Sequence, residues 1–291
     1  MERSMRLLVT GGTGFIGSYL VEMLSQQNEL FCLVQDKDRL RSSLRVEWVI
    51  QDLGSPMDET KLPGHIDAMI HLAQSRHYRD FPERSWDIFD VNIRSTLSLL
   101  EYGRKIGISK FIYASSGGIY GYSYEKFIET DSTNPINFYL TSKYSSELLI
   151  GNYNPYFSTV VLRFFFVYGP NQKGMLIPRL IENIRKGEPI IIYGKSGVRI
   201  NPIHVNDAIK AFSPSLETPV GGVFNIAGDE VISIKELSET IGASVGKDPV
   251  FVYEKNIVPG DIVGDNSRMK SVLGVIPQIS LSEGISELVK S

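Results

Sequence analysis

The stretch RLLVTGGTGFIG, residues 6–17, places three glycines at three-residue spacing directly behind a run of aliphatic side chains. The pattern predicts a strand over Leu7–Val9, a turn, and a helix over Ser18–Gln27. Bare glycine backbone lets a phosphate come close, and the free N–H groups and dipole of a helix N-terminus favour negative charge there. The turn therefore predicts a dinucleotide-binding site, and a tight turn with a purely structural role is the alternative.

Short apolar runs rich in β-branched residues alternate with longer amphipathic segments along the first half of the chain. We expect strands at residues 30–34, 48–50, 68–72, 111–114 and 159–166, and helices at residues 86–105 and 137–152. Strand–helix alternation with continuously apolar strands is typical of a parallel sheet that helices cover on both faces. The predicted fold class is α/β, a Rossmann-like doubly wound parallel sheet.

The character of the sequence changes beyond residue 166. Glycine and proline become frequent, as in RKGEPIIIYGKSG (185–197), and the helical patterns are interrupted. We therefore expect residues 1–165 to form a dinucleotide-binding domain, with a return segment near 200–226. Residues 166–291 are expected to form mainly a smaller, mixed α/β substrate-binding lobe.

The composition restricts the class of protein. The 291 residues carry a formal net charge of −3 with no basic block, so nothing favours nucleic acid or an anionic membrane surface as a partner. No apolar run approaches the ~20 residues of a membrane span, and the first predicted strand begins too early to leave room for a signal peptide. The one cysteine, Cys32, cannot form an internal disulfide. We therefore expect a soluble protein of the reducing cytoplasm.

Several stretches along the chain resemble sequence blocks of the extended short-chain dehydrogenase/reductase family. This family contains nucleotide-sugar epimerases, dehydratases and 4-ketoreductases. The stretches are TGGTGFIG (10–17), DAMIHLA (67–73), VN (91–92), FIYASSGGIYG (111–121), NFYLTSKYSSE (137–147), LRFFFVYGP (162–170), INPIHVNDA (200–208) and FNIAG (224–228). Because they span nearly the whole length, the resemblance implies a bound nicotinamide dinucleotide and a redox active site.

A tyrosine and a lysine four residues apart, Tyr139 and Lys143, share one face of a predicted helix. A phenol with a pKa near ~10 is a poor acid or base at neutral pH. A neighbouring ammonium group and a positive nicotinamide ring both favour the phenolate, so we expect the pKa of Tyr139 to fall toward the working range. Ser116, at the end of a predicted strand, is placed to orient the reacting oxygen. We therefore expect Ser116, Tyr139 and Lys143 to be catalytic.

The resemblance also implies which residues contact the cofactor. Asp52 is similar to a family residue at the adenine, and Lys143 to one that holds the nicotinamide ribose. The full set is Gly11, Gly14, Phe15, Ile16, Gly17, Asp36, Asp52, Leu53, Leu72, Ala73, Asn92, Tyr139 and Lys143.

The end of the second strand bears on the choice between NAD and NADP. An acidic residue there binds the adenosine ribose and disfavours a 2′-phosphate. The family's acidic position holds Gln35 here, and Asp36 follows directly. The basic residues Lys37, Arg39 and Arg41 come next and suit the phosphate of NADP. NAD is favoured through Asp36, and NADP stays open.

The residues after Ser116 distinguish between the family's reactions. The 4,6-dehydratases carry an Asp–Glu pair there, whereas this chain has Gly117 and Gly118, which leave room for a sugar ring and argue against dehydration. The resemblance then implies an NAD(P)-dependent nucleotide-sugar epimerase acting at C4, through a transient keto intermediate with hydride transfer and tyrosine acid/base catalysis. The alternatives are an NAD(P)H-dependent 4-keto-6-deoxysugar reductase, a reductase of non-nucleotide substrates, and a non-catalytic dinucleotide-binding sensor.

Two places depart from the family's pattern for a nucleoside diphosphate. Phe166 stands where an Asn is usual, and Ile257 and Val258 stand where an Arg often precedes the PGD turn. Either other cations hold the diphosphate, with Arg76, Arg79 and Arg199 as candidates, or the substrate is different. The residues expected at the substrate are Arg76, Ser116, Gly117, Phe166 and Arg199.

The loop QSRHYRD, residues 74–80, follows a predicted strand at the sheet edge where ligands gather in such folds. His77 and the arginines of this loop are candidates to face the substrate, and a solvated loop is the alternative.

The remaining histidines carry no metal prediction, because His65, His71 and His204 lack the spacing of metal ligands. The family's dimers lead us to expect a homodimer that packs through residues 86–106 and 137–152. The expected partner is otherwise a small-molecule substrate, a nucleotide sugar.

Overall fold

The computed structural model describes residues 4–36, 46–217, 219, 221–255 and 260–290. Lys37, Arg39, Arg41, Ile257 and Val258 lie outside the described residues. The chain divides into two compact units. The first takes in the chain up to residue 119, residues 134–163 and residues 212–224, and the second takes in residues 120–133, 164–211 and the chain from residue 225.

The first unit is built on a seven-stranded sheet with the order β11-β6-β5-β4-β1-β2-β3. The strands are β1 (Arg6–Thr10), β2 (Glu29–Val34), β3 (Val46–Ile50), β4 (Ala68–His71), β5 (Lys110–Ser116), β6 (Ser158–Phe164) and β11 (Gly222–Ile226). β1 pairs in parallel with β2 and β4, and the pairs β2–β3 and β4–β5 are parallel too. The strand order reverses between β1 and β4, and such a switch point is where ligands bind in open α/β sheets. The prediction of a Rossmann-like doubly wound sheet is confirmed.

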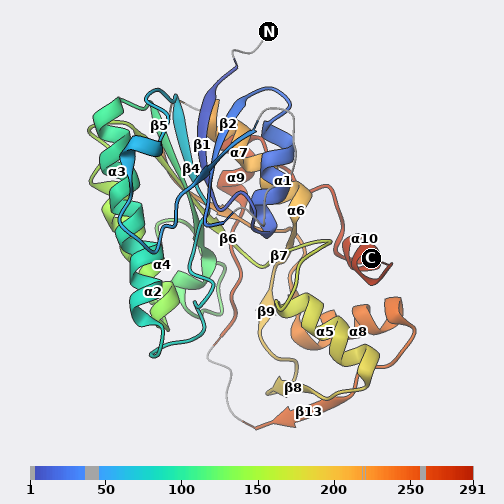
Figure 1. Cartoon of the computed structure of the whole chain (residues 1–291). Coiled ribbons are helices and arrows are strands. Elements are labelled where there is room, and N and C mark those ends of the chain that lie inside the picture. The colour runs from blue at the N-terminus through green and yellow to red at the C-terminus, as the bar shows by residue number, and fades with distance from the viewer. Residues whose placement is uncertain (1–3, 37–45, 218, 220, 256–259, 291) are drawn as a thin grey trace. The chain divides into compact units, whose positions relative to one another are not determined.

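Helices lie on both sides of this sheet, with α3 and α4 side by side on one side and α1 on the other (Figure 1). Their bounds are α1 (Phe15–Leu24), α2 (Ser85–Phe89), α3 (Ser95–Ile106), α4 (Phe138–Gly151) and α7 (Phe212–Glu217), with short helical turns at Glu59–Lys61 and Gly117–Tyr120. The helix expected at residues 86–105 forms with one difference. A single π-helical turn over Asp90–Arg94 separates α2 from α3.

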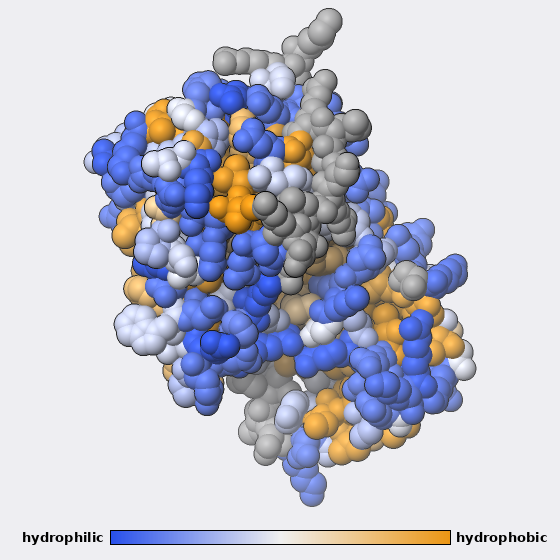
Figure 2. All heavy atoms as spheres, in the orientation of Figure 1, coloured by the Kyte–Doolittle hydropathy of each residue, from blue (hydrophilic) through white to orange (hydrophobic). Residues whose placement is uncertain are grey.

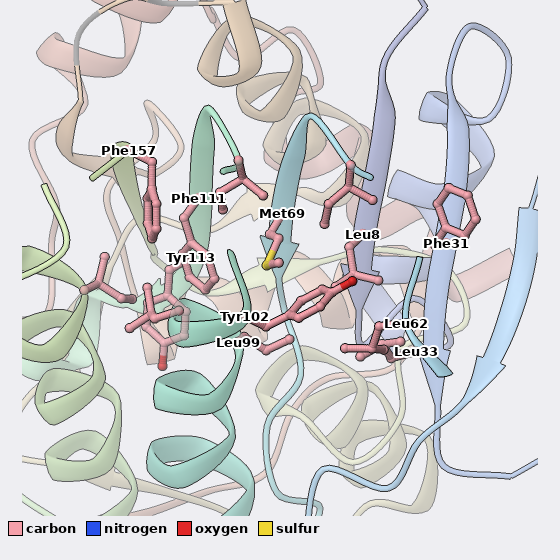
Figure 3. Close-up of a cluster of buried hydrophobic side chains, with 14 of the residues drawn as sticks. Leu8, Phe31, Leu33, Leu62, Met69, Leu99, Tyr102, Phe111, Tyr113 and Phe157 are labelled. Carbon is pink, nitrogen blue, oxygen red and sulfur yellow. The ribbon is translucent and has the colours of Figure 1, made fainter. Parts of the chain in front are cut away.

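One core cluster of the first unit lies between the sheet and α3. Figure 3 shows Leu99 and Tyr102 of α3 beside Leu8 and Met69 of the sheet. All four side chains are almost fully buried. Burial of a large apolar side chain stabilises a fold by roughly 1.5–3 kcal/mol, so this cluster fixes α3 on the strands that carry the predicted site.

Cys32 of β2 is also fully buried, and Gly12 packs over it so closely that a Cβ on Gly12 would stand 3.4 Å from its sulfur. Burial raises the pKa of the Cys32 thiol to about 12. The side chain is therefore a small apolar filler beneath the glycine turn.

The second unit is a mixed α/β structure. Its helices are α5 (Leu176–Lys186), α6 (Val205–Ala208), α8 (Ile234–Val245), α9 (Ser267–Leu273) and α10 (Leu281–Lys290), with a short helical turn at Ile209–Ala211. Its strands form three pairs: β7 (Val167–Tyr168) with β10 (Ile203–His204), β9 (Arg199–Ile200) with β12 (Ile232–Ser233), and β8 (Ile190–Tyr193) with β13 (Phe251–Glu254). The apolar faces of α5, α8 and α10 form its core.

Part of the second unit's surface is apolar. Ile191 and Tyr193 of β8 and Val252 and Tyr253 of β13 are exposed, and Figure 2 shows hydrophobic side chains over this end of the unit. No helix in the described part of the chain is both long enough and apolar enough to span a bilayer.

Helix α4 is fixed at both ends. At its start, the Asn137 side chain accepts a hydrogen bond from the Leu140 backbone N–H at 2.9 Å and caps the helix. Toward its end, Glu147 forms an ion pair with Arg163 of β6, at 2.7 Å between Oε2 and Nη2 and 3.1 Å between Oε1 and Nε. Both side chains of the pair are nearly inaccessible to solvent. Removing one partner of such a pair leaves an uncompensated buried charge.

We therefore expect Glu147→Ala to lower the free energy of unfolding by about 3–5 kcal/mol. The double variant Glu147→Met/Arg163→Met removes both charges, so it should lose less than Glu147→Ala alone. Urea unfolding of the three proteins measures the difference. A double variant that loses as much stability as Glu147→Ala would contradict this account of the ion pair.

Candidate active site

The glycine turn joins the end of β1 to the start of α1. The Gly14 N–H donates to the Gly11 carbonyl oxygen at 2.9 Å, and Gly11 has a φ of 73°, which glycine adopts freely. A Cβ on Gly17 would stand 2.1 Å from the Gly11 oxygen, and one on Gly11 would stand 2.7 Å from the Ala73 nitrogen. Two of the glycines are therefore required by close backbone packing.

Gly14 differs from the other two because it is exposed, and a Cβ there would have only the Gly11 oxygen within 4 Å, at 3.1 Å. Gly14 is also the N-cap of α1, and no side chain caps the helix. The first turn of α1, which contains the partly buried Phe15 and Ile16, holds no acidic residue. The positive end of α1 thus faces open space beside a bare backbone, as a phosphate group requires.

A buried polar chain connects the end of β1 with the end of β4 and the start of α3. Thr10 Oγ1 lies 2.6 Å from His71 Nδ1, and His71 Nε2 lies 3.0 Å from Thr96 Oγ1. Thr96 donates its own proton to the Asn92 carbonyl oxygen at 2.6 Å, so it accepts from His71. Burial, with a smaller contribution from Lys143, lowers the pKa of His71 to about 3. His71 is therefore a neutral imidazole with its proton on Nε2, and Thr10 donates to Nδ1.

Asn92, in the π-helical turn, is fully buried and joins three segments. Its Oδ1 accepts from the Ser75 N–H at 2.8 Å, and its Nδ2 donates to Ser142 Oγ of α4 at 2.8 Å. Its carbonyl oxygen accepts from Ser146 Oγ at 2.7 Å. The side chain thus holds α4 and the loop after β4 in one geometry.

Ser116 and Tyr139 come from neighbouring elements. Ser116 is the last residue of β5, as expected, and its Oγ accepts from the Gly118 N–H at 3.2 Å. A Cβ on Gly118 would stand 3.0 Å from the side chain of Leu140, the residue after Tyr139. The expectation that Gly118 leaves room for a sugar ring is therefore not met, because Leu140 fills that side. Gly117 lies in the helical turn between Ser116 and Gly118.

The Tyr139 side chain is partly buried, and its hydroxyl donates to Gln74 Oε1 at 2.9 Å. Its ring packs against Tyr78, with ring centroids 5.0 Å apart. Burial raises the pKa of Tyr139 above its usual value, and the nearby Tyr78 hydroxyl adds to the rise. The sequence-based expectation that Lys143 lowers this pKa is not met by the protein alone.

The contacts of Lys143 explain the difference. The side chain is buried, and its Nζ donates to the Ala114 carbonyl oxygen at 2.8 Å. The same ammonium group lies 4.8 Å from the centre of the Tyr113 ring. Burial lowers the pKa of Lys143 to about 7, against a smaller opposing effect of Glu147. Lys143 is therefore poised between its charged and neutral forms near neutral pH.

The two aspartates expected at the adenosine occupy different environments. Asp52 is partly buried, and its Oδ1 accepts from the Gly54 N–H at 3.0 Å. Asp36 Oδ1 is buried with no hydrogen-bond partner among the described residues. A buried carboxylate oxygen without a partner is costly and marks a place for a donor group such as a ribose hydroxyl. The uncapped helix α1 and Asp36 together fit a dinucleotide.

Other expected cofactor residues lie along the edge between β1 and β4. The Leu72 N–H donates to the Thr10 carbonyl oxygen at 3.2 Å, and the Ala73 N–H donates to Thr10 Oγ1 at 3.2 Å. Leu53, which follows Asp52, packs against the core of the first unit.

The residues expected at the substrate are divided between the two units. Arg76 is exposed in the loop after β4 of the first unit, where His77 pairs with Asp80. Phe166 and Arg199 belong to the second unit. Phe166 has a φ of 45°, a conformation that Asn adopts more easily than Phe and that ends β6 earlier than expected.

Arg199 is engaged within the second unit. Its Nη2 lies 2.7 Å from Asp261 Oδ2, and its backbone N–H donates to Asp261 Oδ1 at 2.8 Å. This pair, with Lys126, lines a cavity of about 380 Å³. The Arg199 guanidinium is thus paired with a carboxylate, and about half of its side chain is exposed.

Sequence reasoning missed Gln74 as the partner of Tyr139 and missed the chain from Thr10 to Asn92. Gln74 directly follows Ala73 at the end of a predicted strand, and this position near the edge where ligands gather could have indicated a site residue. The buried chain gave no signal, because its threonines and serines are ordinary helix and strand residues.

Comparison with known proteins shows to which family the chain belongs. The model of the NAD dependent epimerase/dehydratase family matches residues 7–227. The chain belongs to this family. The match covers the glycine turn, Ser116, Tyr139 and Lys143, so the resemblance read from the sequence blocks is confirmed.

Individual members of the NAD-dependent epimerase/dehydratase family are similar over almost the whole chain. A putative UDP-glucose 4-epimerase from Methanocaldococcus jannaschii is 30% identical in an alignment that covers 97% of each chain. A dTDP-4-dehydro-6-deoxyglucose reductase from Escherichia coli is 30% identical in an alignment that covers 99% of this chain and 98% of the relative. The structure of UDP-glucuronic acid 4-epimerase from Bacillus cereus in complex with UDP-glucuronic acid and NAD has a TM-score of 0.88 and 28% identity, with 98% of both chains covered.

The lowered pKa of Lys143 predicts how stability depends on pH. Between about pH 7 and the ordinary lysine value of 10.5, the unfolded chain binds more protons at this residue than the folded chain. The contribution of Lys143 to the free energy of unfolding therefore rises with pH in this window, by about 1.4 kcal/mol per pH unit. We expect Lys143→Met to lack that slope when urea unfolding is compared at pH 7.5 and 8.5.

Lys105→Met is the matched control, because Lys105 is exposed on α3 and should leave the slope unchanged. Equal slopes for wild type and Lys143→Met would show that burial does not lower the pKa of Lys143.

Proposed function

We propose that the chain is an NAD-dependent 4-epimerase of a nucleotide sugar. The observation that carries the proposal is the place of the Tyr139 hydroxyl. It bonds to Gln74, which directly follows Ala73, and the Ala73 nitrogen borders the glycine turn at Gly11. A proton-transferring phenol therefore lies beside the turn that fits a dinucleotide.

The candidate site residues of the first unit each have a role in this proposal. The α1 N-terminus holds the pyrophosphate and Asp36 the adenosine ribose, whose diol a carboxylate favours over a 2′-phosphate. NAD supplies reversible hydride exchange with the sugar carbon. Tyr139 takes the proton of the sugar hydroxyl and returns it, and Ser116 holds the reacting oxygen. Lys143 binds the nicotinamide ribose and stabilises the phenolate with its charge.

The comparisons support the substrate class. The M. jannaschii relative is named for UDP-glucose, and the B. cereus structure contains UDP-glucuronic acid with NAD. We propose that the first unit binds the dinucleotide and that the second unit binds most of the nucleotide sugar. The cavity that Lys126 and the Arg199–Asp261 pair line is of a size that suits part of a small ligand.

A second candidate is a keto-sugar reductase. The E. coli dTDP-4-dehydro-6-deoxyglucose reductase matches this chain as well as the epimerase relative does, at 30% identity. Both reactions use the same three residues, so the distinction depends on whether reduced cofactor is consumed.

We also propose a homodimer through the helices α2, α3 and α4. Trp86 and Phe89 of α2, Leu97 of α3 and Leu148 of α4 are exposed apolar side chains in this part of the first unit. A dimer would remove them from water.

The proposed activity is tested with purified protein, NAD and either UDP-glucose or UDP-glucuronic acid. We expect each accepted sugar to equilibrate with its C4 epimer, followed by proton NMR, with no net change in absorbance of reduced cofactor. Tyr139→Phe should slow the reaction by about 10²–10⁴-fold while NAD still binds. Net consumption of NADPH with a dTDP-4-keto-6-deoxysugar, and no epimerisation, would favour the reductase instead.

The glycine turn gives a paired prediction. Gly14→Ala adds a methyl group on the open side of the turn, so we expect NAD affinity to fall about ten-fold or more with a nearly unchanged melting temperature. Gly17→Ala forces a methyl group to within 2.1 Å of the Gly11 oxygen, so we expect a loss of about 1–3 kcal/mol of stability. Calorimetric titration with NAD and thermal unfolding measure the two effects. Unchanged NAD affinity in Gly14→Ala would argue against the turn as the pyrophosphate site.

A further inference from the structure

Among the residues that the structure describes, the hydrogen-bond partner of the Tyr139 hydroxyl is a neutral carboxamide. Tyr139 Oη donates to Gln74 Oε1 at 2.9 Å. Gln74 is exposed and lies outside any helix or strand, three residues after the end of β4. The side chain therefore bonds to the atom that moves the proton in the proposed reaction, and it has room to turn.

The observed hydrogen bond belongs to the protonated tyrosine. A bond that the phenol donates stabilises the neutral form, and burial acts in the same direction. The titratable groups around the ring are Tyr78 in the loop after β4, Tyr113 on β5 and Lys143 one turn along α4. In the resting protein Tyr139 is therefore a phenol.

The proposed reaction requires the other form as well. Tyr139 releases its proton to water to become a phenolate, and the phenolate oxygen then accepts the proton of the sugar hydroxyl as the O–H bond of the sugar breaks. A phenolate is a strong acceptor and cannot donate to Gln74 Oε1. Two acceptor oxygens at hydrogen-bond distance repel each other, so a partner that could only accept would oppose ionisation.

A carboxamide resolves this conflict because it carries an acceptor and a donor of nearly the same shape. A half turn about the Cγ–Cδ bond replaces Oε1 with the Nε2 amino group. The amide then donates to the phenolate in a charge-assisted hydrogen bond, which is stronger than the neutral one. Gln74 gains and loses no proton in this exchange.

We propose that Gln74 is a positioning residue that partners Tyr139 in both protonation states, accepting from the phenol at rest and donating to the phenolate during proton transfer. The inference rests on the proposed function for its role in the reaction. The hydrogen-bond exchange itself is a property of this chain's own residues and can be measured without turnover.

Two substitutions with side chains of similar length to Gln distinguish accepting from the phenol from donating to the phenolate. Glu at position 74 can only accept when ionised, and Met offers neither a strong donor nor a strong acceptor. If Gln74 only accepted from the phenol, Gln74→Met would remove a bond to the neutral form and lower the pKa of Tyr139. If Gln74 also donates to the phenolate, Gln74→Met removes the stronger of the two bonds and raises that pKa.

The measurement is ¹⁹F NMR of the full chain labelled with 3,5-difluorotyrosine, whose more acidic phenol titrates while the protein stays folded. The Tyr139 resonance is assigned by its absence in Tyr139→Phe. We expect its pKa to rise by about one unit or more in Gln74→Glu, and by a smaller amount in Gln74→Met. Gln26→Glu is the control for added charge, because Gln26 is exposed at the end of α1, and it should leave the titration unchanged.

Turnover supplies the second readout. With an accepted nucleotide sugar and NAD, the rising limb of kcat against pH should move upward in Gln74→Glu and Gln74→Met in the order of the NMR titrations. At a fixed pH below that limb we expect kcat to fall about ten-fold in Gln74→Met, with little change in KM.

The possible outcomes test the role of Gln74 and the proposed epimerase function separately. A pKa of Tyr139 that falls or stays constant in Gln74→Met overturns the exchange, whether or not the protein is an epimerase. A failure to epimerise any nucleotide sugar overturns the proposed function, while the NMR titration still decides the role of Gln74.

Discussion

The site depends on a continuous set of buried hydrogen bonds that runs from Thr10 through His71 and Thr96 to Asn92. The Thr96 hydroxyl donates to the Asn92 carbonyl oxygen, so the neutral His71 donates from Nε2 to Thr96 and accepts from Thr10 at Nδ1. A buried polar group without its partner costs about 1–3 kcal/mol, and the set therefore tolerates few other arrangements. It joins β1, which leads into the glycine turn, to Asn92, which bonds to helix α4. The set therefore fixes the position of the glycine turn relative to the helix that carries Tyr139.

Helix α4 positions Tyr139 relative to these hydrogen bonds. Asn92, in the π-helical turn before α3, holds it through Ser142 and Ser146, and the Glu147–Arg163 pair holds it against β6. By contrast, the side chains of Gln74 and Tyr78 contact Tyr139 from a loop, where Gln74 is exposed and Tyr78 is partly buried. In the proposed reaction the Tyr139 oxygen would stay in place while its hydrogen bonds change.

Patterns of local sequence were sufficient for the doubly wound sheet, the glycine turn, the place of Ser116 at a strand end and the shared face of Tyr139 and Lys143. They were insufficient where contacts come from distant segments. The spacing of four residues suggested that Lys143 would lower the pKa of Tyr139, but the ammonium bonds to Ala114 and faces the Tyr113 ring of β5. The π-helical turn at Asp90–Arg94 was equally out of reach, because a one-residue change of hydrogen-bond register leaves the apolar periodicity almost intact.

The position of Cys32 has a practical consequence. It is the chain's one cysteine, it lies in the middle of the sheet, and its thiol holds its proton far above neutral pH. Maleimides and other electrophiles attack the thiolate and need access to it. A cysteine introduced on the surface of either unit would therefore be the one that reacts in the native protein, so spin labels or fluorophores can be attached singly without first mutating the background residue.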